Sequence, residues 1–283
     1  MKILVTGADG FTGKYFTAEA LKNGHEIIAL KSNLNDLALL KQEVLSVVPD
    51  AVVHLAAISF VGHYNDDEFY QVNVIGTLNL LNALLQSCTT PPRVLLASSA
   101  NIYGLPDIEM IDESVIAAPV NHYAVSKLAM EFMVKTYFDK LPIVITRPFN
   151  YTGAGQHENF LIPKLVTHFK RGEKVIELGN LDVSRDFSDV RDVAASYLSL
   201  LESNSSSIVV NICSGHAIAL RDAINMMNII AGYEIEVKVN PAFVRANEIP
   251  RLCGNNDYLK KLINFSPKYT FDQTLTSMFN VVA

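Results

Sequence analysis

The stretch Ile3-Leu-Val-Thr-Gly-Ala-Asp-Gly-Phe-Thr-Gly13 decides the fold of this chain. Its short apolar run predicts a buried strand, and its three glycines lead into residues 11–23, whose apolar side chains recur at helical spacing. Glycines at these intervals permit a tight turn, close packing of helix on strand, and close approach of a pyrophosphate to backbone N–H groups. The stretch therefore predicts the first strand, turn and helix of a dinucleotide-binding domain.

Similar apolar runs continue through the first half of the chain. They stand at residues 27–30, 51–53, 94–96 and 143–145, and the stretch 73–86 between them has helical spacing. Continuous apolar runs are typical of strands buried on both faces of a parallel sheet. The alternation predicts an α/β fold with a doubly wound parallel Rossmann sheet.

The pattern becomes irregular after Tyr151, with frequent glycine and proline. We therefore expect residues 1–150 to form an NAD(P)-binding Rossmann domain, to which later segments at about 180–215 return. Residues 151–283 should form mainly a smaller C-terminal α/β substrate lobe over the carboxyl edge of the sheet.

The composition narrows the class of protein. The 283 residues are 49% hydrophobic and 18% charged, which is typical of a well-filled globular protein, and the net charge of −6 argues against a nucleic-acid polymer as partner. No apolar run is long enough to span a membrane, so we expect a cytoplasmic protein without membrane insertion. Cys88, Cys213 and Cys253 are isolated and lack metal-ligand spacing, so no metal site is expected.

The end of the second predicted strand bears on the choice of cofactor. An acidic residue there would bond the ribose 2′-hydroxyl of NAD, but the chain has Lys31-Ser-Asn33. Lys31 and Ser32 are suited to face a 2′-phosphate, which favours NADP(H) over NAD(H). The alternative is that Lys31 is a solvated loop residue.

A second motif, Tyr123-Ala-Val-Ser-Lys127, opens a predicted helix. Residues at i and i+4 share a helix face, so the ammonium of Lys127 is expected near the phenol oxygen of Tyr123. A free phenol has a pKa of about 10, and proton exchange near neutral pH requires that value to fall by about 3 units. Lys127 and an oxidised nicotinamide ring are candidate sources of that shift.

Two serines, Ser98 and Ser99, end the strand predicted from Arg93, at the sheet edge where ligands bind in such folds. With the glycine pattern, His54-Leu-Ala-Ala57, Asn73-Val-Ile-Gly-Thr77, Ser98-Ser-Ala-Asn-Ile-Tyr-Gly104, Tyr123 to Lys127 and Arg147-Pro-Phe-Asn150, the chain resembles the extended short-chain dehydrogenases/reductases over nearly its whole length. The resemblance implies that Ser99 hydrogen-bonds the substrate oxygen. It also implies that Tyr123 is the general acid/base and that Lys127 holds the nicotinamide ribose.

Two sets of binding residues are predicted in addition to the catalytic residues Ser99, Tyr123 and Lys127. The cofactor-binding set is Gly7, Asp9, Gly10, Phe11, Thr12, Gly13, Lys31, Ser32, Asn33, Leu34, Leu55, Ala56, Ala57, Asn73, Ser98, Tyr123, Lys127 and Arg147. The substrate-binding set is Ser99, Asn101, Tyr123, Asn150, Arg185, Arg245 and Glu248.

The residues after Ser99 narrow the reaction within this family. Sugar-nucleotide 4,6-dehydratases typically carry an Asp-Glu pair there, and the epimerase-reductases that make GDP-fucose carry a cysteine. This chain has Ala100 and Asn101. Simple hydride transfer at a sugar carbon and 4-epimerisation remain.

The carboxyl half is similar to GDP-4-keto-6-deoxymannose reductases, in the segments 147–156, 179–192, 211–215 and 240–248. This resemblance implies reduction of a 4-keto group to give GDP-D-rhamnose or its C4 epimer, GDP-6-deoxy-D-talose. Ala246, where relatives often have proline, and Tyr151-Thr152 depart from the pattern, which leaves the base and the sugar open.

The predicted substrate residues suit a nucleotide diphosphate. Arg185 and Arg245 are each capable of bidentate phosphate contact, Asn150 offers an amide N–H, and Glu248 offers an acceptor to ribose or base. Structural alternatives exist, because Arg185 has Asp186 and Asp189 close in sequence. We also expect Arg191 to pair with Asp192.

Other functions remain open from the sequence. A dTDP-4-keto-6-deoxyglucose reductase would share these residues, an NAD-dependent nucleotide-sugar 4-epimerase would use the same catalytic residues, and a non-catalytic NADP-sensing protein would use the same fold. The resemblance further implies a homodimer formed through the helices that begin near Asn73 and Tyr123.

Overall fold

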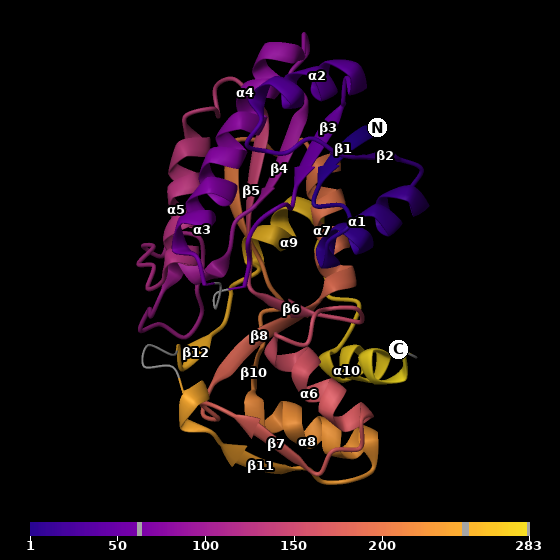
Figure 1. Ribbon diagram of the computed structural model, residues 1–283, viewed down its shortest axis with the longest axis vertical. Coiled ribbons are helices and arrows are strands. Elements are labelled where there is room, and N and C mark those ends of the chain that lie inside the picture. The colour runs from indigo at the N-terminus through magenta and orange to yellow at the C-terminus, as the bar shows by residue number, and fades with distance from the viewer. Residues whose placement is uncertain (61–63, 245–248, 282–283) are drawn as a thin grey trace.

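The apolar runs of the first half form adjacent strands in the computed structural model, which describes residues 1–60, 64–244 and 249–281 (Figure 1). The larger sheet contains β1 (Lys2–Thr6), β2 (Glu26–Ala29), β3 (Ala51–His54), β4 (Arg93–Ala97), β5 (Ile143–Pro148) and β9 (Ile208–Ile212). These strands pair in parallel in the order β2-β1-β3-β4-β5-β9. The predicted doubly wound α/β sheet is confirmed.

The direction of winding changes at β1. Leu4 of β1 pairs with Ile28 of β2 on one side and with Val52 of β3 on the other. Chain connections therefore diverge above the carboxyl ends of β1 and β3, where open α/β sheets bind their ligands.

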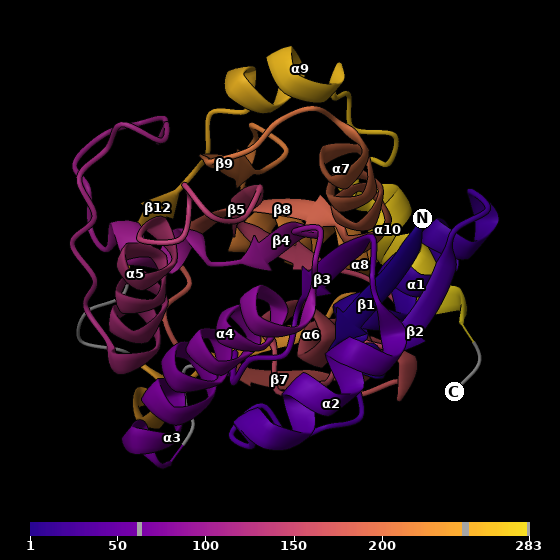
Figure 2. The same ribbon diagram turned by 90° about the horizontal axis from the view of Figure 1, so that it is seen from above.

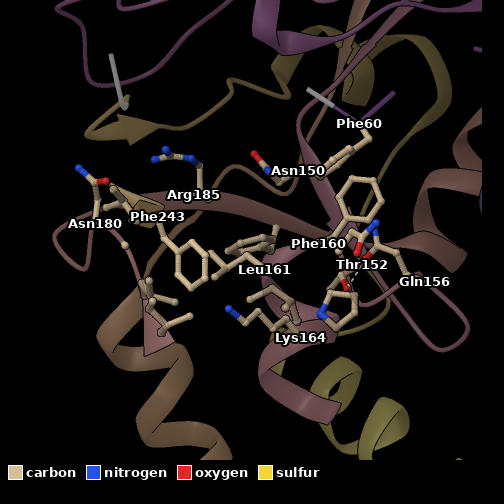
Figure 3. Close-up of a pocket in the computed structure, with 18 of the residues that line it drawn as sticks. Phe60, Asn150, Thr152, Gln156, Phe160, Leu161, Lys164, Asn180, Arg185 and Phe243 are labelled. Atoms are coloured by element: carbon tan, nitrogen blue, oxygen red, sulfur yellow. Dashed lines mark hydrogen bonds between the residues drawn. The ribbon is translucent and has the colours of Figure 1, made fainter. Parts of the chain in front are cut away.

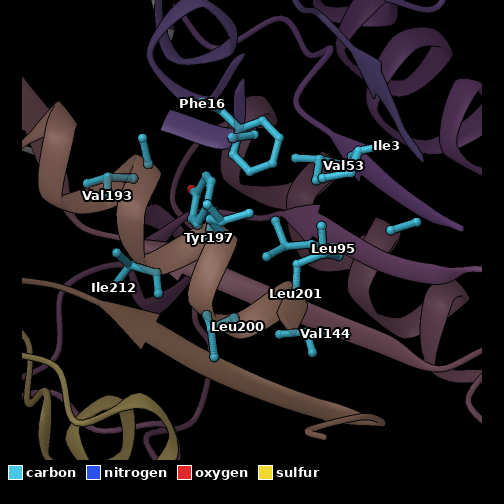
Figure 4. Close-up of a cluster of buried hydrophobic side chains, with 14 of the residues drawn as sticks. Ile3, Phe16, Val53, Leu95, Val144, Val193, Tyr197, Leu200, Leu201 and Ile212 are labelled. Atoms are coloured by element: carbon cyan, nitrogen blue, oxygen red, sulfur yellow. The ribbon is translucent and has the colours of Figure 1, made fainter. Parts of the chain in front are cut away.

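Helices cover both faces of this sheet (Figure 2). One face carries α1 (Phe11–Lys22), α7 (Val190–Glu202) and α9 (Asp257–Ile263), and the other carries α2 (Leu37–Val47), α4 (Thr77–Ser87) and α5 (His122–Lys135). Alternate strand residues face opposite cores: Ile3 and Val5 pack with Phe16 and Tyr197 (Figure 4), while Leu4 packs on the α2, α4 and α5 side. No helix in the described ranges is both long and apolar enough to cross a bilayer.

The helix predicted at residues 73–86 has a more complex start. A short helix, α3 (Asp66–Tyr70), leads into a π-helical segment, η1 (Gln71–Gly76), before α4 begins. A Cβ on Gly76 would lie 3.1 Å from the Leu34 Cβ, so the absence of a side chain at Gly76 allows close packing against the loop after β2.

The smaller lobe lies beyond the carboxyl edge of the large sheet (Figure 1). Its strands are β6 (Asn150–Thr152), β8 (Ser184–Asp189), β10 (Ala217–Ala219) and β12 (Arg251–Leu252), with a separate pair, β7 (Val175–Leu178) and β11 (Glu236–Val239). Its helices are α6 (Leu161–Lys170), α8 (Leu220–Ala231), α10 (Phe271–Asn280) and the short η3 (Pro241–Phe243). An apolar core that includes Leu165, Phe169 and Met227 holds these elements together.

The chain crosses between the lobes several times. Within the stretch 180–215, β8 pairs with strands of the smaller lobe, whereas α7 and β9 pack in the larger lobe. The chain therefore returns to the larger lobe at Val190. Asp186 of β8 is fully buried and accepts backbone N–H groups from Ser214 (2.8 Å), Gly215 (2.9 Å) and Gly254 (3.3 Å). This carboxylate ties the loop after β9 to the smaller lobe.

A buried ion pair fastens α5 to the sheet. Arg147 of β5 donates from Nε to Glu131 Oε1 (3.0 Å) and from Nη2 to Glu131 Oε2 (2.7 Å), and the two side chains are 7% and 0% exposed. Arg147 Nη1 also donates to the Tyr103 hydroxyl (2.9 Å), which donates to Asn211 Oδ1 (2.7 Å). Each charged group in this cluster is satisfied, as burial requires.

We predict that Arg147→Met lowers the free energy of unfolding by about 3–5 kcal/mol, because it leaves the Glu131 carboxylate buried without its cation. Pairing Arg147→Met with Glu131→Leu should restore most of that loss. Urea unfolding of the three variants measures the effect. Arg221→Met is the control, since its pair with Asp182 is exposed and should contribute less than about 1 kcal/mol. A loss below that value for Arg147→Met would contradict the prediction.

Candidate active site

The glycine-rich turn after β1 is closely packed against its surroundings. Gly7 has φ +70°, and a Cβ there would lie 2.8 Å from the Ala56 nitrogen. A Cβ on Gly13 would lie 2.1 Å from the Gly7 oxygen. Gly10 precedes α1, and no side chain of the described residues caps that helix. Its first N–H groups are therefore available to a phosphate.

The end of β3 is aligned with this turn by a buried histidine. His54 Nδ1 lies 2.7 Å from the Thr6 hydroxyl and its Nε2 lies 2.9 Å from the Thr77 hydroxyl. Burial, aided by the Lys127 charge, lowers the pKa of His54 to about 3, so the ring is neutral. The Thr6 oxygen accepts the Ala56 N–H (3.0 Å), which holds the predicted cofactor loop 55–57 beside the glycines.

The predicted cofactor loop after β2 contains a contact that the sequence does not indicate. Lys31 and Asn33 are exposed there, while Ser32 and Leu34 are partly buried. Glu43 of α2 accepts the Lys31 N–H (2.9 Å) and the Ser32 N–H (2.7 Å). A carboxylate thus lies at the end of β2, although none stands there in the sequence.

Asn73, another predicted cofactor residue, lies in the π-helical segment and is buried. Its Oδ1 accepts the Ile58 N–H (3.1 Å), and its Nδ2 donates to the Ser126 hydroxyl (3.0 Å). Ser126 in turn donates to the Tyr123 carbonyl (2.8 Å). Asn73 therefore joins the loop after β3 to the first turn of α5.

The predicted catalytic residues come from two elements that meet at the sheet edge. Ser98 and Ser99 directly follow β4, and Tyr123 and Lys127 lie in the first turns of α5. Asn121 caps that helix by accepting the Ala124 N–H (2.9 Å), so its start is well defined. The Ser98 hydroxyl is buried and has no partner within the described residues, as a group that awaits a ligand would.

The Ser99 hydroxyl faces the Tyr123 phenol and acts to lower its pKa. Ser99 Oγ accepts from Asn101 N (3.2 Å) and Asn101 Nδ2 (3.1 Å), so its own proton points onward to an acceptor. Burial raises the pKa of Tyr123 to about 12, which outweighs the lowering by Ser99. The phenol therefore keeps its proton at neutral pH in the free protein.

Lys127 lies one turn after Tyr123 in α5 and is bonded to the end of β4. Its ammonium is buried and donates to the Ala97 carbonyl (2.7 Å) at the end of β4. Burial lowers its pKa to about 8, against a smaller raising effect of Glu131. A buried ammonium held at the strand end is well placed to donate to a further oxygen ligand.

A cavity of about 960 Å³ opens between the two lobes (Figure 3). Asn101, Asn150 and Arg185 line it together with apolar side chains that include Phe160. Figure 3 shows Asn150 and Arg185 on the same side of the pocket and Lys164 on another. Lys164 Nζ lies 4.5 Å from the Phe243 ring centroid. Cations beside apolar and amide groups suit a nucleotide diphosphate.

Tyr151 connects this cavity to the glycine-rich turn. Its hydroxyl lies 2.8 Å from the Thr12 hydroxyl, and its ring stacks on Phe11 with centroids 6.2 Å apart. Asp9 is exposed in the same turn. The first residues of β6 thus lie directly on the start of α1, between the predicted cofactor and substrate regions.

Some predicted site residues lie elsewhere or are not described. The Arg147 guanidinium, predicted to contact cofactor, is engaged by Glu131 and Tyr103. Arg245 and Glu248 lie outside the described residues. The predicted ion pair of Arg191 with Asp192 is wrong. Arg191 binds Asp189 instead (2.7 Å), because Asp189 is the N-cap of α7 and its carboxylate also accepts the Arg191 N–H. The Asp192 carboxylate accepts the Lys268 and Tyr269 N–H groups.

Glu43, Glu131, Tyr151 and Lys164 were not predicted as site or anchoring residues. Glu131 had a detectable signal, because it lies at i+4 from Lys127 on the same helix face. Glu43 and Lys164 had none, since charged residues on predicted helices usually face solvent.

Comparisons with known proteins find similarity over nearly the whole chain. The family model of GDP-mannose 4,6 dehydratase matches residues 27–278. The chain is 36% identical over 277 residues to GDP-6-deoxy-D-talose 4-dehydrogenase of Aggregatibacter actinomycetemcomitans, covering 95% of this chain and 94% of that protein. It is 35% identical over 298 residues to GDP-6-deoxy-D-mannose reductase of Pseudomonas aeruginosa, covering 99% and 96%. The structure of RMD from Pseudomonas aeruginosa complexed with NADPH matches with a TM-score of 0.89 at 32% identity, covering 98% of this chain and 97% of that one.

We predict that Gly13→Ala weakens NADPH binding by at least about tenfold, because the new methyl group would displace the Gly7 carbonyl and open the turn. Isothermal titration calorimetry measures this directly. Gly24→Ala, at the other end of α1, is the control: it adds strain at φ +81° but meets no atom within 4 Å. Equal affinities for the wild type and Gly13→Ala would show that the turn does not bind the dinucleotide.

Proposed function

This chain belongs to the GDP-mannose 4,6-dehydratase family of extended short-chain dehydrogenases/reductases, and we propose that it uses NAD(P)H to reduce the 4-keto group of a GDP-linked 4-keto-6-deoxyhexose. The product would be GDP-D-rhamnose or its C4 epimer, GDP-6-deoxy-D-talose. The observation that carries the proposal is the placement of Tyr123 with Ser99 at the sheet edge, where Ser99 is bonded to Asn101, a residue that lines the cavity together with Arg185.

The immediate surroundings of Ser99 favour reduction over dehydration. Ala100 and Asn101 follow it, and neither side chain carries a carboxylate to remove water from the sugar. The protonated state of Tyr123 has the same implication, because a reductase needs a proton donor at the start of its reaction. We infer from the residues after Ser99 that this chain catalyses reduction rather than dehydration.

The residues of the first lobe fit a nicotinamide dinucleotide. Gly7, Gly10 and Gly13 form a turn so tight that a Cβ on any of them would press on neighbouring backbone atoms. Among the described residues, no side chain caps the start of α1 and the buried Ser98 hydroxyl has no partner. When bound, the reduced dinucleotide supplies the hydride. We propose that NADP(H) is favoured over NAD(H), because the Lys31 ammonium is exposed at the end of β2 and suits a 2′-phosphate.

The protein would supply the proton and the orientation. In this proposal Ser99 donates its hydrogen bond to the C4 oxygen and Tyr123 transfers its phenolic proton to that oxygen as negative charge develops there. Lys127, fixed by Ala97, would bond the nicotinamide ribose and stabilise the resulting phenolate. Solvent or the ribose hydroxyl would then return a proton to Tyr123.

The diphosphate and base would lie in the cavity of the second lobe. Arg185 and Asn150 are the described candidates to bond phosphate oxygens, and Lys164 adds a further cation. Arg245 and Glu248 remain predicted contacts outside the described residues. Among these groups Arg185 would contribute the most directional contact, because a guanidinium can bind two phosphate oxygens at once.

We predict that the purified protein oxidises NADPH with GDP-4-keto-6-deoxymannose and that dTDP-4-keto-6-deoxyglucose is a much poorer substrate. Loss of absorbance at the nicotinamide band measures turnover, and NMR of the product reports the C4 configuration. Turnover with the dTDP sugar alone would move the assignment to a dTDP-sugar reductase. Tightly bound NAD with no net cofactor oxidation would instead indicate a 4-epimerase.

We expect Tyr123→Phe to lower kcat by about 10²–10⁴-fold, because the proton donor is lost while the ring remains. NADPH affinity should stay within about threefold of the wild type. Tyr137→Phe on the segment after α5 is the matched control, since that hydroxyl bonds Asn82 of α4 (3.0 Å) and neither residue lines the cavity. Full turnover by Tyr123→Phe would overturn the catalytic assignment.

A further inference from the structure

A carboxylate from α2 occupies the two backbone N–H groups that follow β2. Glu43 Oε1 lies 2.9 Å from the Lys31 nitrogen and Oε2 lies 2.7 Å from the Ser32 nitrogen. Successive backbone N–H groups at the end of a strand are donors that phosphate groups commonly use. In this protein a fixed anion already binds both of them.

This carboxylate is ionised. Partial burial acts to raise the pKa of Glu43, but hydrogen bonds from the Ser32 hydroxyl and the two backbone N–H groups, with the nearby Lys31 charge, lower it overall. Of the two residues expected to face a 2′-phosphate, Lys31 has an exposed side chain, whereas the Ser32 N–H is already bonded to an anion.

The loop that carries these groups is held in place at both ends. Leu30 N donates to the Val5 carbonyl (2.8 Å), which keeps the start of the loop on β1. Asn79 of α4 donates to the Leu34 carbonyl (2.9 Å), and Asp36 caps α2 by accepting the Leu39 N–H (3.0 Å). These contacts hold the Lys31 and Ser32 N–H groups in place beside the Glu43 carboxylate.

The position matters because the end of the second strand adjoins the adenosine ribose in dinucleotide-binding sheets. A carboxylate there favours a ribose 2′-hydroxyl, which can donate to it, and opposes a 2′-phosphate, which repels it. We propose that Glu43 is a specificity-determining residue that limits the preference for NADPH over NADH and lets the enzyme use both. This inference rests on the proposed use of a nicotinamide dinucleotide.

The test compares dinucleotide binding in Glu43→Gln and the wild type by isothermal titration calorimetry with NADPH and NADH, in the absence of a sugar substrate. Removing one negative charge close to the 2′-phosphate should tighten NADPH binding by at least about tenfold, since at an effective dielectric constant near 20 two unit charges about 12 Å apart already repel each other by about one decade in binding. NADH affinity should change by less than about threefold. The ratio of the two dissociation constants is the decisive quantity.

Glu26→Gln is the matched control. Glu26 begins the same strand and is exposed. At about 3.3 Å per residue it lies about 16 Å from Lys31, a distance that exceeds the screening length in physiological salt. The Glu26→Gln substitution removes the same net charge and should leave the ratio of dissociation constants unchanged. Glu43→Ala serves if Glu43→Gln unfolds, and thermal melting of each variant shows which is folded.

The possible outcomes separate this inference from the proposed reaction. A rise in NADPH selectivity confined to the Glu43 variants supports the role of Glu43 even if the keto sugar is not reduced. An unchanged ratio in folded Glu43 variants, or an equal rise in Glu26→Gln, overturns it. In that case turnover of the keto sugar by the wild type would leave the proposed reaction standing.

Discussion

The buried Glu131–Arg147 ion pair is the constraint on which the arrangement of the site depends. Tyr123, Lys127 and Glu131 follow one another at four-residue intervals along one face of α5. Glu131 binds Arg147 on β5, and Lys127 binds the Ala97 carbonyl on β4, so the helix is fixed in rotation and depth over two neighbouring strands. These two contacts place Tyr123 beside Ser99. A helix held only by apolar contacts would have more freedom to rotate.

The second constraint is the change of winding at β1. It brings together the carboxyl ends of β1, β3 and β4, and with them the glycine turn, the loop after His54 and the two serines. The smaller lobe then closes over that edge through β6, where Tyr151 contacts both Thr12 and Phe11. Contacts between elements far apart in sequence thus put the dinucleotide region and the nucleotide-sugar cavity next to each other.

The chemistry of the site follows from burial as much as from residue identity. Burial raises the pKa of Tyr123, lowers that of Lys127 and keeps His54 neutral. The three groups therefore serve different purposes: a proton donor, a cation at a strand end, and an uncharged link between threonines. The spacing of Tyr123 and Lys127 puts both side chains on one face of α5, and the tertiary structure adds the bond from the ammonium to the Ala97 carbonyl of β4.

The sequence by itself determined the α/β class, the glycine turn, the serines at the end of β4 and the helix that carries Tyr123 and Lys127. These features are local, because glycine spacing, apolar periodicity and an N-cap act within a few residues. Only the tertiary structure decided that Glu43 lies at the end of β2, that Arg191 binds Asp189, and that Arg147 faces Glu131. A charged side chain on a helix shows no partner in the sequence, because its partner is selected by whichever strand end or helix start the packing brings within hydrogen-bond distance.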